Sequence, residues 1–208
     1  MNIYINEESI LHIETLIVGL PEHINQLREI KYNNQSINEQ LETLKQHHII
    51  GSSVGKISST MFYTNNQPKR LLTVGLGNLK DLSYQRLLKV WGHTFQFLKQ
   101  EHINEAEVLL DTFISKYNDS IEVAKTFGLQ SNQSIYQFDN YKSDKKAPYQ
   151  PNIYVQTEFD KVNSAIYEGQ QLGKSINLAR ELSQMPPNIL TPQYFAEEID
   201  NHFKELSL

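Results

Sequence analysis

The chain has 208 residues, a formal net charge of −5 at pH 7 and a hydrophobic fraction of 39%. This length is enough for one domain with its own core, or for one domain and the start of another. The chain has no cysteine, which excludes a disulfide framework, a cysteine-ligated metal and a thiol nucleophile. No apolar run approaches the roughly 20 residues of a membrane span, and the first residues lack the basic and apolar regions of a secretory signal. We therefore expect a cytoplasmic protein with no membrane partner.

The charge distribution also argues against a nucleic-acid partner. The sequence pI is about 5.8, whereas nucleic-acid-binding domains usually have a basic face or a pI above about 9. The densest basic stretch, residues 142–146, holds three lysines and one aspartate in a segment typical of a solvated turn. We therefore expect no nucleic-acid partner.

The first half of the chain predicts a strand, a helix and a hairpin. Residues 14–20 (ETLIVGL) form a short apolar run rich in β-branched residues, which predicts a buried strand. In residues 36–45 apolar side chains recur at i, i+4 and i+7, the spacing of a helix face. Two further strands are predicted at residues 56–64 and 69–75. The turn residues 65–68 (NNQP) between them indicate a hairpin.

The second half alternates helices with strands. Residues 83–100 carry one continuous apolar stripe at helical spacing. A strand is predicted at residues 107–114 and a helix at residues 119–130. A short strand at residues 152–157 precedes a long helix at residues 160–184, whose apolar side chains follow the 3.6-residue period.

This alternation predicts the fold class. Apolar strands that alternate with helices indicate an α/β fold whose central sheet is covered by helices on both faces. The hairpin makes the sheet mixed, because its two strands run antiparallel.

The C-terminal segment stops the long helix and starts another. Pro186 and Pro187 lack N–H donors and force the preceding backbone to extend. Thr191 then has the character of an N-cap, and Pro192 suits the first helical position. The apolar residues of this last helix are Phe195, Ile199, Phe203 and Leu206. The helix either folds back on the preceding domain or begins a second one.

Two glycine-rich segments invite comparison with phosphate-binding loops. Residues 51–56 (GSSVGK) have three residues between the glycines where a P-loop has four, and Ile57 stands where that motif needs Ser or Thr. Residues 75–77 (GLG) lack the third glycine of a dinucleotide fingerprint, because Lys80 occupies its position. Both segments predict ordinary turns, although a weak anion site at the helix N-terminus after residue 77 stays open.

No catalytic constellation emerges from the residues themselves. The seven histidines form no i, i+4 pair with an intervening glutamate, and the adjacent His47 and His48 would diverge by about 100° on a helix. The acidic residues are scattered, and no Gly-x-Ser-x-Gly nucleophile motif is present. The sequence therefore predicts no catalytic, cofactor-binding or metal-binding residue in this chain.

Residues 173–197 carry the most distinctive pattern. Asn-Leu-Ala-Arg at residues 177–180 is followed by Pro-Pro-Asn-x-Leu-Thr-Pro at residues 186–192. This segment resembles the junction segment of the leucine (cytosol) aminopeptidase family of metallopeptidases. Upstream, residues 72–77 resemble the central N-terminal strand of that family, and residues 136–143 resemble its Tyr-x-Phe-x-x-Tyr-Lys segment. The matching junction positions are Asn177, Leu178, Ala179, Arg180, Leu182, Pro186, Pro187, Asn188, Leu190, Thr191, Pro192, Ala196 and Glu197.

The resemblance implies three parts of the chain. Residues 1–158 would form an N-terminal α/β domain similar to macro domains. Residues 159–190 would form a connector helix and a Pro-Pro linker. Residues 191–208 would be the first helix of a truncated C-terminal catalytic domain.

In that family the C-terminal domain holds two divalent metals, such as Zn or Mn, with a catalytic lysine and an arginine. Its Gly-Lys-Gly, Asp-Thr-Gly-Gly and Asn-Thr-Asp-Ala-Glu-Gly-Arg segments do not occur here, and Arg180 belongs to the connector. The resemblance thus implies a parent reaction, removal of N-terminal amino acids from peptides, with no catalytic or metal-binding residue in this chain. We expect the chain to be inactive alone, to serve in scaffolding or assembly, and to have the missing catalytic domain as its partner.

Two further interpretations stay open. As in macro domains, the N-terminal domain could bind a small ligand such as an ADP-ribose-type nucleotide, although the glycine-rich loops used for this are not evident. Alternatively, it could serve in assembly, within a homo-oligomer of the full-length parent. For the chain by itself we expect a monomer or a weak dimer.

Overall fold

A six-stranded sheet forms the centre of the molecule. The computed structural model describes residues 1–7, 13–26, 29–32, 35–64, 67–139, 141, 143–144 and 147–205. All neighbouring strands are parallel except β5 and β6, which are antiparallel. The predicted mixed sheet is therefore confirmed. The strand order is β1 (Asn2–Ile5), β8 (Asn152–Gln156), β7 (Glu105–Leu109), β2 (Thr15–Pro21), β6 (Gln67–Gly77) and β5 (Ile57–Thr64).

The predicted hairpin consists of β5 and β6. Its register runs from Ile57 opposite Val74 to Thr64 opposite Gln67. Residues 65–66 of the predicted turn lie outside the described residues. β6 is longer than the predicted strand because β2 pairs with its other edge as far as Gly77.

Two strands differ from the sequence prediction. β1 is not among the predicted strands, because it has only four residues and pairs with β8 about 150 positions further along the chain. The strand predicted at residues 107–114 is wrong at both ends, since β7 runs from Glu105 to Leu109 and a 3-10 helix, η3 (Leu110–Phe113), follows it. Thr112 explains the turn: its hydroxyl donates to the Leu109 carbonyl oxygen (2.7 Å) and accepts from Gly19 N–H of β2 (2.7 Å).

Short elements connect β2 to the first helix. They are the 3-10 helix η1 (Ile24–Gln26) and a small antiparallel sheet of β3 (Lys31–Tyr32) and β4 (Gln35–Ser36). Another 3-10 helix, η2 (Leu79–Asp81), follows β6.

Helices cover both faces of the sheet, as predicted. In β2 the side chain of Ile17 packs into one hydrophobic core, whereas Leu16 and Val18 pack into the other, as the alternation of side chains along a strand requires. The first core contains buried residues of α2, α3 and the start of α4. The second includes Leu41 of α1. The helices are α1 (Asn38–Gln46), α2 (Tyr84–Gln100), α3 (Ser120–Gln133), α4 (Val162–Gln184) and α5 (Pro192–Glu205).

An aromatic cluster holds α2 and α3 against the sheet. The ring of Trp91 lies 4.1 Å from that of Phe113 in η3 and 4.9 Å from that of Phe127 in α3, between centroids. All three side chains are fully buried. Large buried aromatic rings contribute strongly to core stability, so this cluster joins α2, η3 and α3 into one unit.

α3 and α4 are in direct backbone contact. A Cβ added at Gly169 would lie 2.1 Å from the carbonyl oxygen of Lys125, and one at Gly128 would lie 2.1 Å from that of Ile166. A Cβ at Gly173 would meet a third carbonyl oxygen at 2.7 Å. Only glycine leaves room for such an approach, so these positions set the distance between the two helices.

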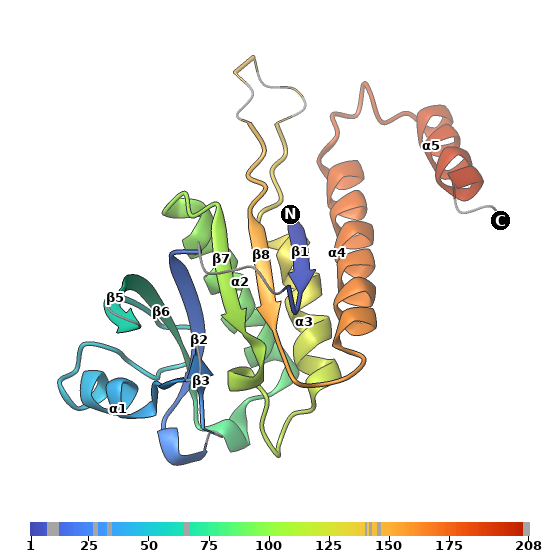
Figure 1. The fold of residues 1–208 in the computed structure, drawn as a ribbon. Helices are drawn as coiled ribbons and strands as arrows, with labels where there is room; N and C mark the ends of the chain where they lie inside the picture. Colours follow the sequence, from blue (N-terminus) through green and yellow to red (C-terminus); the bar gives the residue numbers. More distant parts are fainter. Residues whose placement is uncertain are drawn as a thin grey trace.

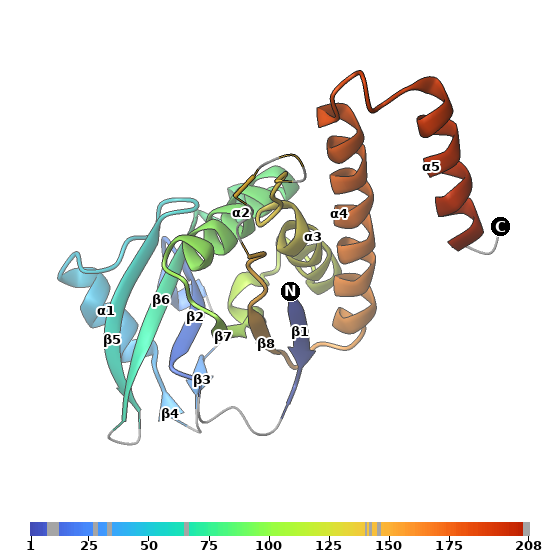
Figure 2. The same cartoon turned by 90° about the horizontal axis from the view of Figure 1, so that it is seen from above.

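α5 is capped as predicted and stands apart from the sheet. Thr191 Oγ1 accepts a hydrogen bond from Tyr194 N (3.2 Å), and the Thr191 carbonyl accepts from Phe195 N (2.9 Å). Figure 1 and Figure 2 both show α5 beyond α4, on the side away from the sheet. Phe195 and Ile199 are 42% and 38% exposed. Leu206, the last position of the predicted apolar stripe, lies outside the described residues.

Gly169→Ala is expected to lower the free energy of unfolding by about 2 kcal/mol or more, because its Cβ would collide with the Lys125 backbone. Gly92→Ala in α2 is the matched control. Its Cβ would lie 3.3 Å from the end of the Gln130 side chain, and alanine favours a helix over glycine. Urea unfolding followed by circular dichroism measures both variants. Equal effects of the two substitutions would contradict the importance of the α3–α4 contact.

Candidate functional site

The carboxyl ends of the parallel strands define the first candidate site. Ligands of open α/β sheets usually bind in the crevice outside these strand ends. A cavity of about 280 Å³ lies at the ends of β7 and β8, and another of about 650 Å³ lies near the start of α3. Asp111 lines both. The first is lined by Glu29, Ile30, Lys31, Leu109, Asp111, Thr112, Gln156, Thr157 and Glu158.

The carboxylate of Asp111 is engaged by the fold itself. Its Oδ1 accepts a hydrogen bond from the Thr157 hydroxyl (2.5 Å), and its Oδ2 accepts one from Glu158 N (2.9 Å). Thr112, its neighbour in η3, uses its hydroxyl for the bonds to Leu109 and Gly19. These polar groups join the end of β7 to the end of β8, so their first role is structural.

The balance of charge in the first cavity is acidic. Among the described residues, Glu29, Asp111 and Glu158 line it beside one cation, Lys31; Arg28 lies outside the described residues. Lys31 Nζ lies 3.4 Å from Glu29 Oε2, an exposed ion pair. Gln156 Nε2 is buried and has no hydrogen-bond partner among the described residues. The described part of the lining therefore has more carboxylates than cations, and Gln156 offers an amide donor to a ligand.

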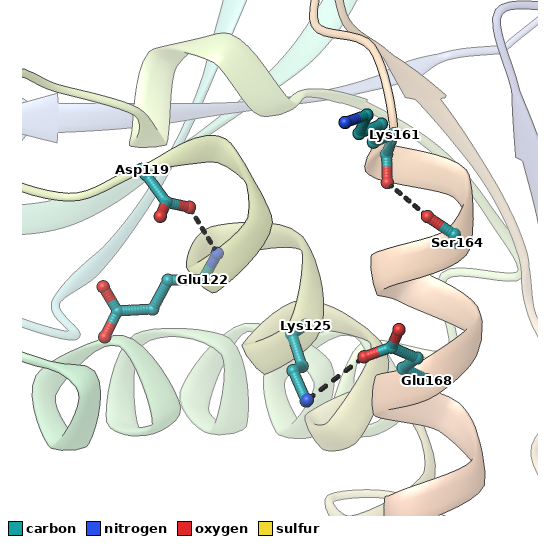
Figure 3. A network of polar contacts seen from close by, with 6 residues as sticks. All are labelled: Asp119, Glu122, Lys125, Lys161, Ser164 and Glu168. Atoms are coloured by element: carbon teal, nitrogen blue, oxygen red, sulfur yellow. Dashed lines mark hydrogen bonds and ion pairs between the residues drawn. The ribbon is translucent and has the colours of Figure 1, made fainter.

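The N-terminus of α3, beside the second cavity, is already capped. Asp119 Oδ1 accepts a hydrogen bond from Glu122 N at 2.9 Å (Figure 3). A carboxylate at this position satisfies an N–H group that a bound anion would otherwise use. The side chain of Asp119 therefore competes with any phosphate group here.

The two glycine-rich segments of the sequence meet each other. Gly55 N donates to the Gly75 carbonyl (2.8 Å), Gly75 N to the Lys56 carbonyl (2.8 Å) and Gly77 N to the Ser52 carbonyl (2.6 Å). A Cβ at Gly75 would approach backbone atoms of residues 52–53 to as little as 2.1 Å. These N–H groups bind carbonyl oxygens, so the glycines serve close backbone packing and do not form a phosphate cradle.

A buried group of titratable side chains forms a second candidate site. Tyr32 donates a hydrogen bond to Glu107 Oε2 (2.9 Å), and Lys69 Nζ donates to the Tyr32 hydroxyl (2.7 Å) and to the Ile13 carbonyl (2.6 Å). Tyr32, Lys69 and Glu107 are only 5%, 6% and 2% exposed. They come from β3, β6 and β7, and together they fasten the β3–β4 segment to the sheet.

Burial controls the protonation of this group. It raises the pKa of Glu107 above the ordinary value, although the Tyr32 hydrogen bond and the Lys69 charge lower it in part. Burial also lowers the pKa of Lys69, against the charges of Glu107 and Glu14, and raises that of Tyr32. Perturbed pKa values mark many active sites but also occur in structural networks. None of the cavities described above is lined by these three residues, so we interpret the group as structural.

This group cannot be recognised in the sequence alone. Its three members are far apart in the chain and form no motif. The available signal was weak, because β7 (EAEVL) carries two glutamates and only Glu107 is buried, whereas Glu105 is exposed. A charged residue in a strand is seldom buried without a partner, but the sequence does not show which of the two is buried.

Neither a metal-binding group nor a membrane span occurs among the described residues. No three His, Asp or Glu side chains within this part of the chain gather as metal ligands would. No helix there is both long and apolar enough to cross a bilayer. His12 lies outside the described residues.

Residues of the junction segment anchor α4 to the end of α3. Asn177 Nδ2 donates to the Asn132 carbonyl oxygen (3.0 Å), and the Arg180 guanidinium lies 4.5 Å above the ring of Tyr136. Arg180 also donates to the Gln133 carbonyl (3.4 Å). The structure thus brings together the Asn-Leu-Ala-Arg segment and the first residue of the Tyr-x-Phe segment, which are about 40 positions apart. Residues 140 and 142 of the latter segment lie outside the described residues.

A second polar contact joins the same two helices nearer their other ends. Lys125 Nζ of α3 lies 3.1 Å from Glu168 Oε2 of α4 (Figure 3). The two side chains are 40% and 61% exposed, so solvent screens this pair and it contributes little to stability. It supplements the glycine contact and the Asn177 hydrogen bond along the same interface.

A family of known proteins matches most of the described domain. The N-terminal domain of the cytosol aminopeptidase family matches residues 17–145, more than half of the sequence. The chain therefore belongs to the cytosol aminopeptidase family, as its N-terminal domain.

Solved structures share the fold. A mutant of tomato leucine aminopeptidase superposes with a TM-score of 0.72 at 16% identity, covering 100% of this chain and 43% of that one. The bottromycin maturation enzyme BotP gives a TM-score of 0.69 at 16% identity, covering 94% of this chain and 38% of that one. The chain thus spans about two fifths of the length of these proteins.

The pH dependence of stability tests the interpretation of Glu107. Because the pKa of Glu107 is raised in the folded state, its ionisation opposes folding. As pH rises above the ordinary value of 4.5, the wild type should lose unfolding free energy relative to Glu107→Gln. Urea unfolding between pH 4 and pH 8, values chosen to span about that window, measures the difference between the two proteins.

Glu105→Gln removes an exposed carboxylate from the same strand. As a surface substitution it should change the unfolding free energy by less than about 0.5 kcal/mol. A difference between the wild type and Glu107→Gln that is flat across the pH range would contradict the burial argument.

Proposed function

We propose that these 208 residues act as the non-catalytic N-terminal domain of a leucyl (cytosol) aminopeptidase-like metallopeptidase in the cytoplasm. The parent reaction is the removal of N-terminal amino acids from peptides. The role proposed for this chain is scaffolding and assembly. The observation that carries the proposal is the family match over residues 17–145.

The geometry of the connector supports a scaffolding role. The first half of α4 belongs to the core through Val162, Ala165 and Ile166, while the second half is held by Asn177 and Arg180. A helix anchored along its length transmits the orientation of one domain to whatever follows it. The residues that give the family resemblance are thus the ones that fix the direction in which the chain leaves the domain.

The His, Asp and Glu side chains of the described residues are not arranged to bind the two divalent metals of the family. The carboxylate of Asp111 is used by Thr157 and Glu158, and no group of three suitable ligands gathers in the described part of the chain. We therefore derive no catalytic step from these residues, and we propose that the metals bind in the catalytic domain. There they would supply an activated water and stabilise the oxyanion.

An activity assay tests the proposal. The purified 208-residue chain, supplied with Mn²⁺ or Zn²⁺, is expected to release no chromophore from leucine p-nitroanilide above the protein-free blank. A cytosol aminopeptidase containing its catalytic domain, assayed in parallel, is the positive control. Metal-dependent release by the pure chain would place catalytic residues within it and overturn the proposal.

A second candidate function is binding of an ADP-ribose-type nucleotide. The observation that favours it is the cavity at the strand ends with the unpartnered Gln156 amide. Its acidic lining opposes it, because a diphosphate needs positive charge or free N–H donors. The capped start of α3 removes one such source of donors.

Titration calorimetry with ADP-ribose separates the two functions. The acidic cavity predicts no detectable heat up to about 1 mM ligand, a range that covers weak binding. Gln156→Leu serves as the control for any signal that is seen. Binding by the wild type that this variant abolishes would establish the ligand-binding function and contradict our interpretation of the charge.

A further inference from the structure

At one edge of the central sheet, β5 has no second partner strand among the residues that the structure describes. β5 pairs only with β6 in the sheet, and Figure 2 shows it at the outer edge, near α1. A groove of about 420 Å³ lies between α1 and β5. It is lined by Glu39, Gln40, Thr43, Leu44, Met61, Phe62 and Tyr63. Solvent therefore reaches the strand from this side.

The hydrogen-bond pattern identifies which backbone groups of β5 point outward. Gly75 N donates to the Lys56 carbonyl at 2.8 Å, so these two residues form a hydrogen-bonded pair. In an antiparallel ladder such pairs alternate, so residues 58, 60, 62 and 64 bond to β6. The N–H and C=O groups of residues 57, 59, 61 and 63 then face away from the sheet. Among the described residues no backbone hydrogen bond outside the sheet reaches them.

The opposite edge of the sheet, formed by β1, is better protected than β5. β1 has only four residues, and the chain turns at Asn6, whose φ is 51°. The Asn6 side chain donates to the Thr157 carbonyl and accepts from Thr157 N, both at 3.0 Å. Short strands and abrupt turns are ways in which proteins keep sheet edges from pairing. β5 has twice the length, with no charged residue and no proline.

We propose that β5 is an interaction surface for a second copy of this chain. The two β5 strands would pair antiparallel across a two-fold axis and join the sheets of both protomers. A strand without charge meets no like charge when it pairs with itself. Met61 and Tyr63, 54% and 66% exposed in the single chain, would lie close to their copies across the axis.

Closure of the assembly also favours β5–β5 pairing between two copies over head-to-tail pairing of β5 with β1. Pairing β5 with β1 of another copy would leave a free edge at each end and allow open fibres. Pairing β5 with β5 consumes both open edges and closes after two copies. The interface adds to the proposed scaffolding role and does not depend on it, since it is a property of this sheet.

Sedimentation velocity and hydrogen exchange test the proposal on the 208-residue chain. With increasing concentration, the mass should rise toward twice 24.1 kDa. The amides of Ser59, Met61 and Tyr63 should become protected over the same concentration range. The amides of residues 58, 60 and 62 should be protected at all concentrations, because they bond to β6.

Met61→Pro removes one outward N–H from each copy and leaves the bonds to β6 intact. It should raise the dimer dissociation constant at least about tenfold. Met61→Thr, which keeps the N–H and favours a strand, is the matched control and should still dimerise. Should Met61→Pro not fold by circular dichroism, Met61→Lys replaces it, because it brings two ammonium groups near the axis. Dimerisation of Met61→Lys should then recover at high salt.

Three results would overturn the proposal. The first is a chain that stays monomeric at every concentration. The second is a dimer that persists unchanged in Met61→Pro or Met61→Lys. The third is a dimer in which the outward amides of β5 exchange as fast as in the monomer. Capture of an extended peptide by an otherwise monomeric chain would assign the edge to another partner and likewise overturn self-pairing.

Discussion

The backbone contact between α3 and α4 is the constraint on which the arrangement of this domain depends. Gly128, Gly169 and Gly173 let carbonyl oxygens of one helix approach the backbone of the other, where any Cβ would collide. This approach brings Val162, Ala165 and Ile166 into the core of the sheet. It also fixes the axis of α4, and therefore the point from which the chain continues to α5.

Local patterns in the sequence predicted the elements whose side-chain period lies within one segment of the chain. The apolar period of residues 160–184 closely matches α4 (Val162–Gln184), and the strand-turn-strand pattern matches the β5–β6 hairpin. Elements fixed by distant partners left weaker signals. β1 is defined by the pairing of Asn2 with Asn152, and β7 ends where the Thr112 hydroxyl meets Gly19 of another strand. Neither contact can be predicted from a stretch of about ten neighbouring residues, because each joins residues that are far apart in the chain.

The polar sites were still less predictable, because their members come from separate elements. Tyr32, Lys69 and Glu107 form one hydrogen-bonded group across three strands. The sequence of β7 did not indicate it, because the same strand also carries an exposed glutamate, Glu105. The sequence did allow both glycine-rich segments to be separated from phosphate loops by their spacing. It could not predict that they pack on each other, with Gly75 against residues 52–53.

The connector and the open edge lie at opposite ends of the sheet. In the strand order β1-β8-β7-β2-β6-β5, α4 packs on α3 beyond the β1 end of the sheet. The open edge strand, β5, forms the opposite end. Figure 1 shows the two regions on opposite sides of the molecule. A copy that pairs with β5 would therefore approach from the side away from α4 and α5. The proposed self-association would thus leave the described part of the connector, α4 and α5, uncovered.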